Sequence, residues 1–251
     1  MSKPIPVSYY FSEFFGTFTM MFIGIAAIIL NFGTSITSSW IPDPSLRLLL
    51  TGIIFASGAT LVVYSPVGKI SGAHINPAVS MAFWLNKKIT FTTFLRYAFV
   101  QTLGSWVAII VLNTFWHESL TKVAYGMTLP GEGYGLFFVF ITEILITFLL
   151  VTTILAGSHF KKIVPFLGLI VGILVAILVF LTAPISGTSL NPARSWGPAL
   201  VAENLSNQWL YLIAPLVGSG LAFLLTKSLR PLCAKLNHAS VDKNCPYNCK
   251  F

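Results

Sequence analysis

Six apolar stretches alternate with shorter polar segments along the chain. They cover residues 9–30, 46–63, 92–112, 136–155, 164–183 and 209–226. A helix needs about 20 apolar residues to cross a bilayer, and it satisfies its own backbone hydrogen bonds in lipid. The pattern therefore predicts an all-α, multi-pass integral membrane protein with six transmembrane helices.

Composition supports this interpretation. Of the 251 residues, 55% are hydrophobic and only 9% are charged, whereas soluble domains carry about 25% charged residues. The first apolar stretch is longer than the core of a signal peptide and contains Glu13, so we interpret it as a retained helix. We expect one transmembrane domain over residues 1–236 and a flexible cytoplasmic tail over residues 237–251.

The basic residues lie mostly on one side of the predicted helices. Six crossings place both termini and three loops together, and twelve of the fifteen basic residues then share that side. The positive-inside rule makes this side cytoplasmic, and a plasma or bacterial inner membrane is the default location. The net charge of +8 is thus a topology signal, and we expect no nucleic-acid partner.

Two segments between the helices match each other. Residues 70–80 read Ile-Ser-Gly-Ala-His-Ile-Asn-Pro-Ala-Val-Ser, and residues 185–195 read Ile-Ser-Gly-Thr-Ser-Leu-Asn-Pro-Ala-Arg-Ser. Both are too apolar for ordinary loops and too short to cross. Glu13 in the first helix and Glu143 in the fourth form a second matching pair, which indicates a duplication.

The duplication divides the chain into repeats at about residues 8–115 and 134–229. Each repeat holds three crossings, an odd number, so the second copy enters the bilayer from the opposite side as an inverted repeat.

The Asn-Pro-Ala motifs predict the start of two short helices. They consist of Asn76, Pro77 and Ala78, and of Asn191, Pro192 and Ala193. Asn is a favoured N-cap and Pro a favoured first helical residue. Each motif then begins a half-helix of about ten residues, which reaches from the bilayer centre to one surface. Two capped interfacial helices in ordinary loops are the alternative, and the inverted match argues against them.

These motifs and the spacing of six helices around them resemble the aquaporin, or major intrinsic protein, family. The resemblance extends from Glu13 to Pro215. It implies six transmembrane helices with two re-entrant half-helices, and a homotetramer in the lipid bilayer in which each protomer holds its own pore. It also implies passive conduction of water down osmotic gradients while ions and protons are excluded. No nucleotide loop, catalytic Ser/His/Asp set or metal cluster appears in the sequence, so we expect no enzymatic activity, cofactor or metal.

The resemblance further assigns roles to single residues. Asn76 and Asn191 would donate hydrogen bonds into the pore, and Arg194 would stand at its outer constriction. The carbonyls of two loop segments would line the lumen, and these belong to Gly72, Ala73 and His74, and to Gly187, Thr188 and Ser189. Glu13 and Glu143 would brace the re-entrant loops, and a proton relay through them is the alternative. For His74 a structural role is expected, because no second ligand accompanies it.

One residue of the selectivity filter depends on how the segment before Asn76 is aligned with the family, and two alignments are possible. Counting back twenty residues from Asn76, as the family spacing implies, reaches Ala56, and Phe55 stands beside it. Pro66 is a plausible one-residue insertion, which shifts the position to Phe55, and we prefer this choice. The filter would then consist of Phe55, Val179, Thr188 and Arg194.

Two sets of positions disagree about the conducted solute. Ser195 and Ala199 are of the family's water type, whereas Val179 replaces a histidine frequent in strict water channels. Facilitated passage of glycerol or other small neutral solutes is therefore the alternative to water alone. A secondary transporter is a less favoured alternative, because Arg194 is the only charge we place in the lumen. An ion channel is opposed by the positive half-helix N-termini and by Arg194.

The three cysteines are Cys233, Cys245 and Cys249. Because an odd number is crowded into a polar terminal segment, we expect no disulfide framework. Cys245 and Cys249 are expected to be reduced.

Overall fold

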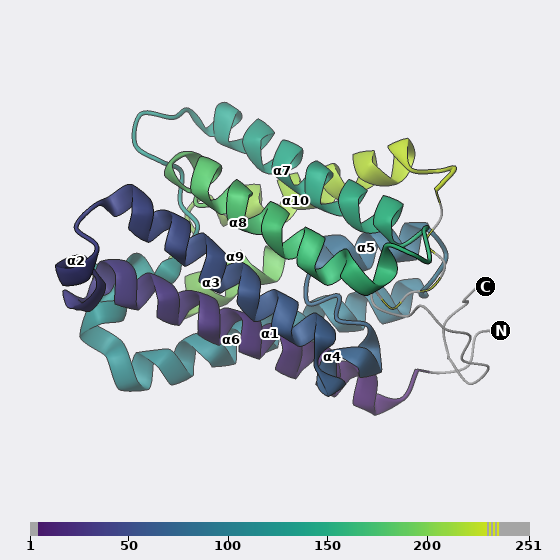
Figure 1. Ribbon diagram of the computed structural model, residues 1–251, viewed down its shortest axis with the longest axis horizontal. Coiled ribbons are helices and arrows are strands. Elements are labelled where there is room, and N and C mark those ends of the chain that lie inside the picture. The colour runs from purple at the N-terminus through teal and green to yellow at the C-terminus, as the bar shows by residue number, and fades with distance from the viewer. Residues whose placement is uncertain (1–4, 230, 232, 234, 236–251) are drawn as a thin grey trace.

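The computed structural model describes residues 5–229, 231, 233 and 235 (Figure 1). Six helices in this part of the chain are long and apolar enough to cross a membrane, and strands are absent from it. They are α1 (Val7–Ile28, continued by the π-turn Ile29–Gly33), α3 (Pro44–Tyr64), α6 (Phe91–Lys122), α7 (Leu136–Gly157), α8 (Leu167–Ser186, preceded by the 3₁₀ turn Val164–Phe166) and α10 (Gln208–Leu225). The prediction of an all-α protein with six membrane-crossing helices is confirmed.

Shorter helices fill the connections. The two half-helices are α5 (Pro77–Leu85) and α9 (Pro192–Val201), and each begins at the proline of its motif. Three further elements were not expected from the hydrophobic pattern: α2 (Ile36–Trp40), α4 (Pro66–Ser71) and the 3₁₀ turn Ala124–Gly126.

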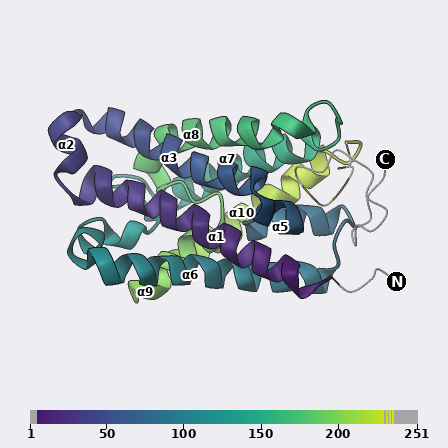
Figure 2. The ribbon, with the colours of Figure 1, turned by 60° about the horizontal axis from the view of Figure 1, so that its bottom comes forward.

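The two repeats interlock through the half-helices. Helix α1 packs on α6 as α7 packs on α10, and α3 meets α8 between the repeats. Helix α5 packs on α10 and α9 on α6, so each half-helix contacts the last long helix of the other repeat. Figures 1 and 2 show α5 in the half of the molecule that holds the start of α1 and the end of α10, and α9 toward the opposite half. Their N-termini therefore point toward the middle of the molecule.

Helix α6 extends ten residues beyond the end that hydropathy predicts, from Leu112 to Lys122, across a kink at Trp116, where φ is −133° and ψ is 35°. The added segment is polar, but Leu120 within it is fully buried, and the backbone of Ser119 packs closely against Gly33. Hydropathy marks where a helix leaves the apolar layer. It does not mark where tertiary contacts allow the helix to end.

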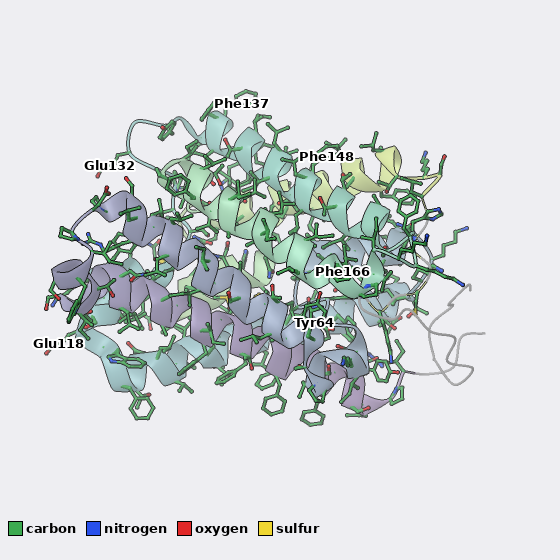
Figure 3. All side chains as sticks on the ribbon, viewed as in Figure 1. Tyr64, Glu118, Glu132, Phe137, Phe148 and Phe166 are labelled. Atoms are coloured by element: carbon green, nitrogen blue, oxygen red, sulfur yellow. The ribbon has the colours of Figure 1, made fainter. Side chains whose placement is uncertain are left out.

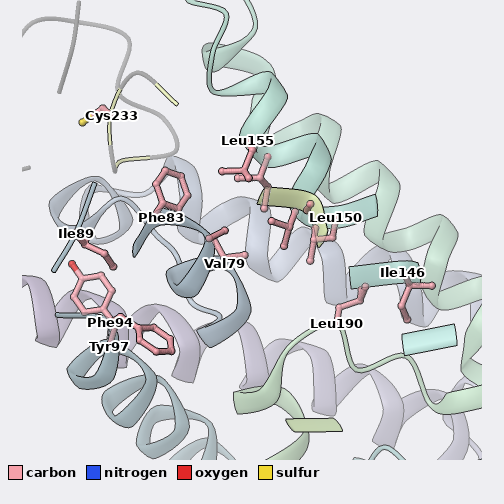
Figure 4. Packing of buried hydrophobic residues seen from close by; sticks show 14 of the residues in the cluster. Val79, Phe83, Ile89, Phe94, Tyr97, Ile146, Leu150, Leu155, Leu190 and Cys233 are labelled. Atoms are coloured by element: carbon pink, nitrogen blue, oxygen red, sulfur yellow. The ribbon is translucent and has the colours of Figure 1, made fainter. Parts of the chain in front are cut away.

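A buried apolar cluster surrounds the half-helix α5 (Figure 4). It includes Val79 and Phe83 from α5, Leu150 from α7, and Cys233. Cys233 is disulfide-bonded, so the expectation for the cysteines is wrong at this residue. Spacing in a polar segment could not indicate that residue 233 is buried against the helices. Cys245, Cys249 and the predicted tail 237–251 lie outside the described residues.

Candidate functional site

The motif asparagines cap their half-helices. Asn76 has extended backbone angles, and its Oδ1 accepts a hydrogen bond from the Ala78 N–H at 2.8 Å. Asn191 has the same conformation, and its Oδ1 accepts from the N–H groups of Ala193 at 3.0 Å and Arg194 at 3.4 Å. These bonds satisfy backbone donors that would otherwise lie unpaired at a helix start.

The same two side chains also tie the repeats together. Asn76 Nδ2 donates to the Leu190 carbonyl, and Asn191 Nδ2 donates to the Ile75 carbonyl, both at 2.9 Å. Each carbonyl belongs to the residue that precedes the opposite asparagine. An amide nitrogen carries two hydrogens, so each asparagine keeps a second donor beyond this reciprocal link. No local sequence pattern indicates this link.

The loops before the half-helices share an unusual backbone. Left-handed φ angles occur at three matched pairs of positions. These are Gly72 (103°) and Gly187 (74°), Ala73 (55°) and Thr188 (50°), and Ile75 (43°) and Leu190 (58°). Such angles are costly for residues with a Cβ and persist only where surrounding contacts hold them.

Two buried glutamates supply those contacts. Glu13 accepts from the His74 N–H at 3.0 Å and the Ile75 N–H at 2.7 Å. In the second repeat, Glu143 accepts from the Ser189 N–H at 2.8 Å and the Leu190 N–H at 3.1 Å. All four carboxylate oxygens therefore receive loop donors. Through these bonds the two carboxylates hold the backbone of both loops, and bracing remains the expected role, with a proton relay as the alternative.

We expect Glu143→Gln to destabilise the protein by about 1–3 kcal/mol, because one loop donor then faces an amide NH₂ instead of an acceptor. Glu143 accepts three hydrogen bonds in all, because its Oε1 also accepts from Ser186 Oγ at 2.7 Å. The substitution weakens one of these three bonds. Thermal unfolding in detergent measures the effect. Glu118→Gln, at an exposed position, is the matched control, and an equal unfolding temperature for both variants would contradict the bracing role.

Two cavities run between the repeats and meet at a common boundary. The first, which we call the distal cavity, has a volume of about 210 Å³ and lies toward the loop residues Gly126 and Met127. The second, which we call the proximal cavity, has a volume of about 90 Å³, and both motif asparagines line its wall. Five residues line both cavities and form what we call the junction: Phe55, Val175, Ser189, Leu190 and Arg194.

The expected filter residues gather at and beside the junction. Val179 and Thr188 line the distal cavity. The Arg194 guanidinium lies 5.5 Å from the centre of the Phe55 ring, and its Nη1 donates to the Gly126 carbonyl at 2.7 Å. Ala56, the alternative to Phe55, lines a separate groove between α3 and α8.

The structure places most of the expected carbonyl-bearing residues in the cavity walls. Ala73 and His74 line the proximal cavity, and Gly187, Thr188 and Ser189 line the distal one. Gly72 lines neither and instead packs against the backbone of Lys235.

The His74 ring is held inside the protein. Its Nδ1 lies 3.2 Å from Ser80 Oγ, and the ring stacks on Phe83 at 4.6 Å between centroids. These contacts fit the expected structural role. Within the described residues, no group of three or more His, Cys, Asp and Glu side chains is placed to hold a metal ion.

The loop that closes over Arg194 was not predicted from the sequence. Besides the Gly126 carbonyl, this loop provides Thr128, whose hydroxyl donates to Ser195 Oγ at 2.7 Å. Ser195 Oγ lies 2.6 Å from Ser189 Oγ. The chain of hydroxyls links the loop to a junction residue across 67 positions of sequence, and no local pattern indicates it.

Comparisons with known proteins agree with this geometry. The family described as "Major intrinsic protein" matches residues 2–226. The chain is 36% identical over 257 residues to aquaporin NIP3-1 of Arabidopsis thaliana, covering 93% of this chain and 76% of that protein. It is 35% identical over 218 residues to glycerol uptake facilitator protein-like 6 of Lactiplantibacillus plantarum, covering 85% and 94%.

A solved structure shares the fold. The aquaglyceroporin from Plasmodium falciparum aligns with a TM-score of 0.73 at 24% identity, covering 89% of this chain and 96% of that one.

Proposed function

Because the chain belongs to the major intrinsic protein family, whose members are membrane channels for water or small solutes, we propose that it passively conducts water together with small uncharged solutes. The junction carries the proposal, since it joins two cavities at an aromatic ring opposite a buried arginine.

Conduction requires replacement of the hydration shell that a solute loses in a narrow pore. The second amide hydrogen of Asn76 and of Asn191 is available as a donor in the proximal cavity. Arg194 has further N–H groups beside the one bonded to Gly126. Apolar residues such as Val175 and Phe55 complete the wall, so a solute bonds on one side and slides past the other.

Ion exclusion follows from charge at the same place. The N-termini of α5 and α9 bring the positive ends of two helix dipoles together, and Arg194 adds a full positive charge at the junction. Cations and protons meet an electrostatic barrier there, whereas neutral molecules do not. A cation channel and a proton-coupled transporter are less compatible with this arrangement.

The residues that line the cavities determine which solutes can pass. Val179 lines the distal cavity, and its side chain is smaller than histidine and offers no hydrogen bond. Ser195 and Ala199 are fully buried and line neither cavity, so they do not contact the solute. We therefore give Val179 more weight and propose efficient water flow with measurable passage of glycerol-sized neutral molecules.

We expect Val179→His to reduce glycerol permeability by about tenfold, since added bulk in a binding wall discriminates by roughly this factor, while water permeability falls less. Light scattering of proteoliposomes after water, glycerol and urea gradients measures both rates. Val217→His, on an exposed face of α10, is the control. Wild-type protein that passes water but neither glycerol nor urea above empty liposomes would overturn the proposed solute range.

Orientation and assembly are also part of the proposal. We place both termini in the cytoplasm of a plasma or bacterial inner membrane, on the evidence of the basic residues. Glu118 and Glu132 lie at the end of the molecule away from the start of α1 (Figure 3), which is compatible with this orientation. The disulfide at Cys233 favours the reverse, because disulfides are rare in the cytosol. Labelling of single cysteines placed at residues 118 and 161 in intact cells decides between them.

For assembly we propose a homotetramer with one pore in each protomer. Many apolar side chains on the long helices are exposed in the single chain, so lipid or neighbouring protomers must cover them. The mass of the detergent-solubilised protein tests the tetramer.

A further inference from the structure

Gly24 occupies a gap in the pore-facing side of α1. Met20 lines the proximal cavity and Ile28 lines the distal cavity. Gly24 lies midway between them, and residues spaced by four share one face of a helix. At the height of the junction, α1 therefore presents a residue without a side chain.

The ring of Phe55 fills this gap. A Cβ built on Gly24 would lie 2.3, 2.4 and 2.6 Å from three carbons of the Phe55 ring. Phe55 comes from α3, so an aromatic side chain of one helix lies directly on the backbone of another. The Arg194 guanidinium lies over the same ring, 5.5 Å from its centre.

Glycines elsewhere in the long helices pack on side chains, as Gly168 does on Tyr64, or on backbone. Gly104 packs against the Phe14 carbonyl and Gly218 against the Ile144 carbonyl. Those positions allow two helix backbones to approach, which is the usual role of small residues in membrane helices. Gly24 differs from all of these in its neighbour, because its three nearest atoms belong to the ring of Phe55, which lines both cavities.

We propose that Gly24 is a positioning residue that sets the width of the junction by seating Phe55 away from Arg194. This inference rests on the proposed function and adds a determinant of solute size that does not touch the solute. A methyl group at residue 24 would displace the ring by about 1 Å to restore ordinary contact. Since the ring borders both cavities, displacement away from α1 brings it into the pore.

The transport test compares Gly24→Ala with wild type in proteoliposomes. We expect glycerol permeability to fall by about tenfold and water permeability to fall less, so the glycerol-to-water ratio drops. Gly220→Ala is the matched control, because a Cβ there meets no atom within 4 Å. The double variant Gly24→Ala/Phe55→Leu should recover glycerol passage. An unchanged ratio in a folded Gly24→Ala protein, or no recovery in the double variant, would overturn the proposal.

Thermal unfolding tests the contact between Gly24 and the Phe55 ring without relying on transport. The Gly24→Ala substitution should lower the unfolding temperature in the Phe55 background and lower it less in the Phe55→Leu background. Equal losses in both backgrounds would mean that residue 24 does not seat the ring, whatever the channel conducts. If Gly24→Ala alone does not assemble, the double variant should assemble, and failure of both would overturn the proposal. Wild-type liposomes that pass neither water nor glycerol would overturn the proposed function alone.

Discussion

Replacing Arg194 with valine is expected to produce a channel that still passes water but leaks protons or monovalent cations. Arg194 is 6% exposed and lines both cavities. A charge acts far more strongly at such a site than in water, because the effective dielectric constant is low. Its removal also detaches the loop carbonyl of Gly126 and leaves more space beside Phe55, so glycerol passage should rise. A pH-sensitive dye inside proteoliposomes, combined with osmotic swelling, measures both effects.

Arg96→Val provides the matched control. Arg96 is an exposed cation packed over the Tyr10 ring and lines neither pore cavity, so its loss should leave ion exclusion intact. Undiminished ion exclusion in Arg194→Val would show that the dipoles of α5 and α9 are sufficient. Arg194 would then act mainly as a donor that orients solutes.

Asn191→Leu is expected to abolish most functional channel. The substitution removes the acceptor for the N–H groups of Ala193 and Arg194 and the donor to the Ile75 carbonyl. Loss of an N-cap alone costs about 1 kcal/mol, and each buried backbone group that loses its partner costs about 1–3 kcal/mol. We expect a large fall in correctly folded protein, measured by size-exclusion chromatography, and a matching fall in water permeability.

Asn191→Ser separates folding from conduction at this position. Serine is also a favoured N-cap, but it lacks the amide that links the repeats and supplies the second donor. We expect this variant to fold in useful amounts and to conduct water more slowly per molecule than wild type. Asn204→Leu, in an exposed loop, is the control. Water conduction by Asn191→Ser at the wild-type rate would contradict a donor role in the pore.

The chain pattern predicted the fold closely because the bilayer imposes simple rules. Every apolar stretch long enough to cross became a helix, and both Asn-Pro-Ala motifs started a half-helix where capping chemistry requires one. The matched motifs also indicated the inverted repeat. Hydropathy failed at α6, where a polar helical segment continues to Lys122, and composition failed at Cys233.

The residues of the candidate site could be predicted only in part from the sequence. Motif residues such as Asn76, Glu143 and Arg194 could be named from the sequence, and the structure brings their side chains or loops to the region between the repeats. The choice between Phe55 and Ala56 stayed open, because adjacent helix residues point in different directions and a linear spacing cannot fix the rotation of α3. The structure places Phe55 at the junction and Ala56 in the outer groove.

The sequence by itself therefore determined which segments enter the membrane, where the half-helices start and which polar residues accompany them, since these features depend on local composition and capping. Only the tertiary structure decided how the polar groups are paired. The reciprocal bonds of Asn76 and Asn191, the loop bond to Arg194 and the seat of Phe55 on Gly24 join residues from different elements. Such contacts depend on how the helices are rotated and packed, which no periodicity within a single segment specifies.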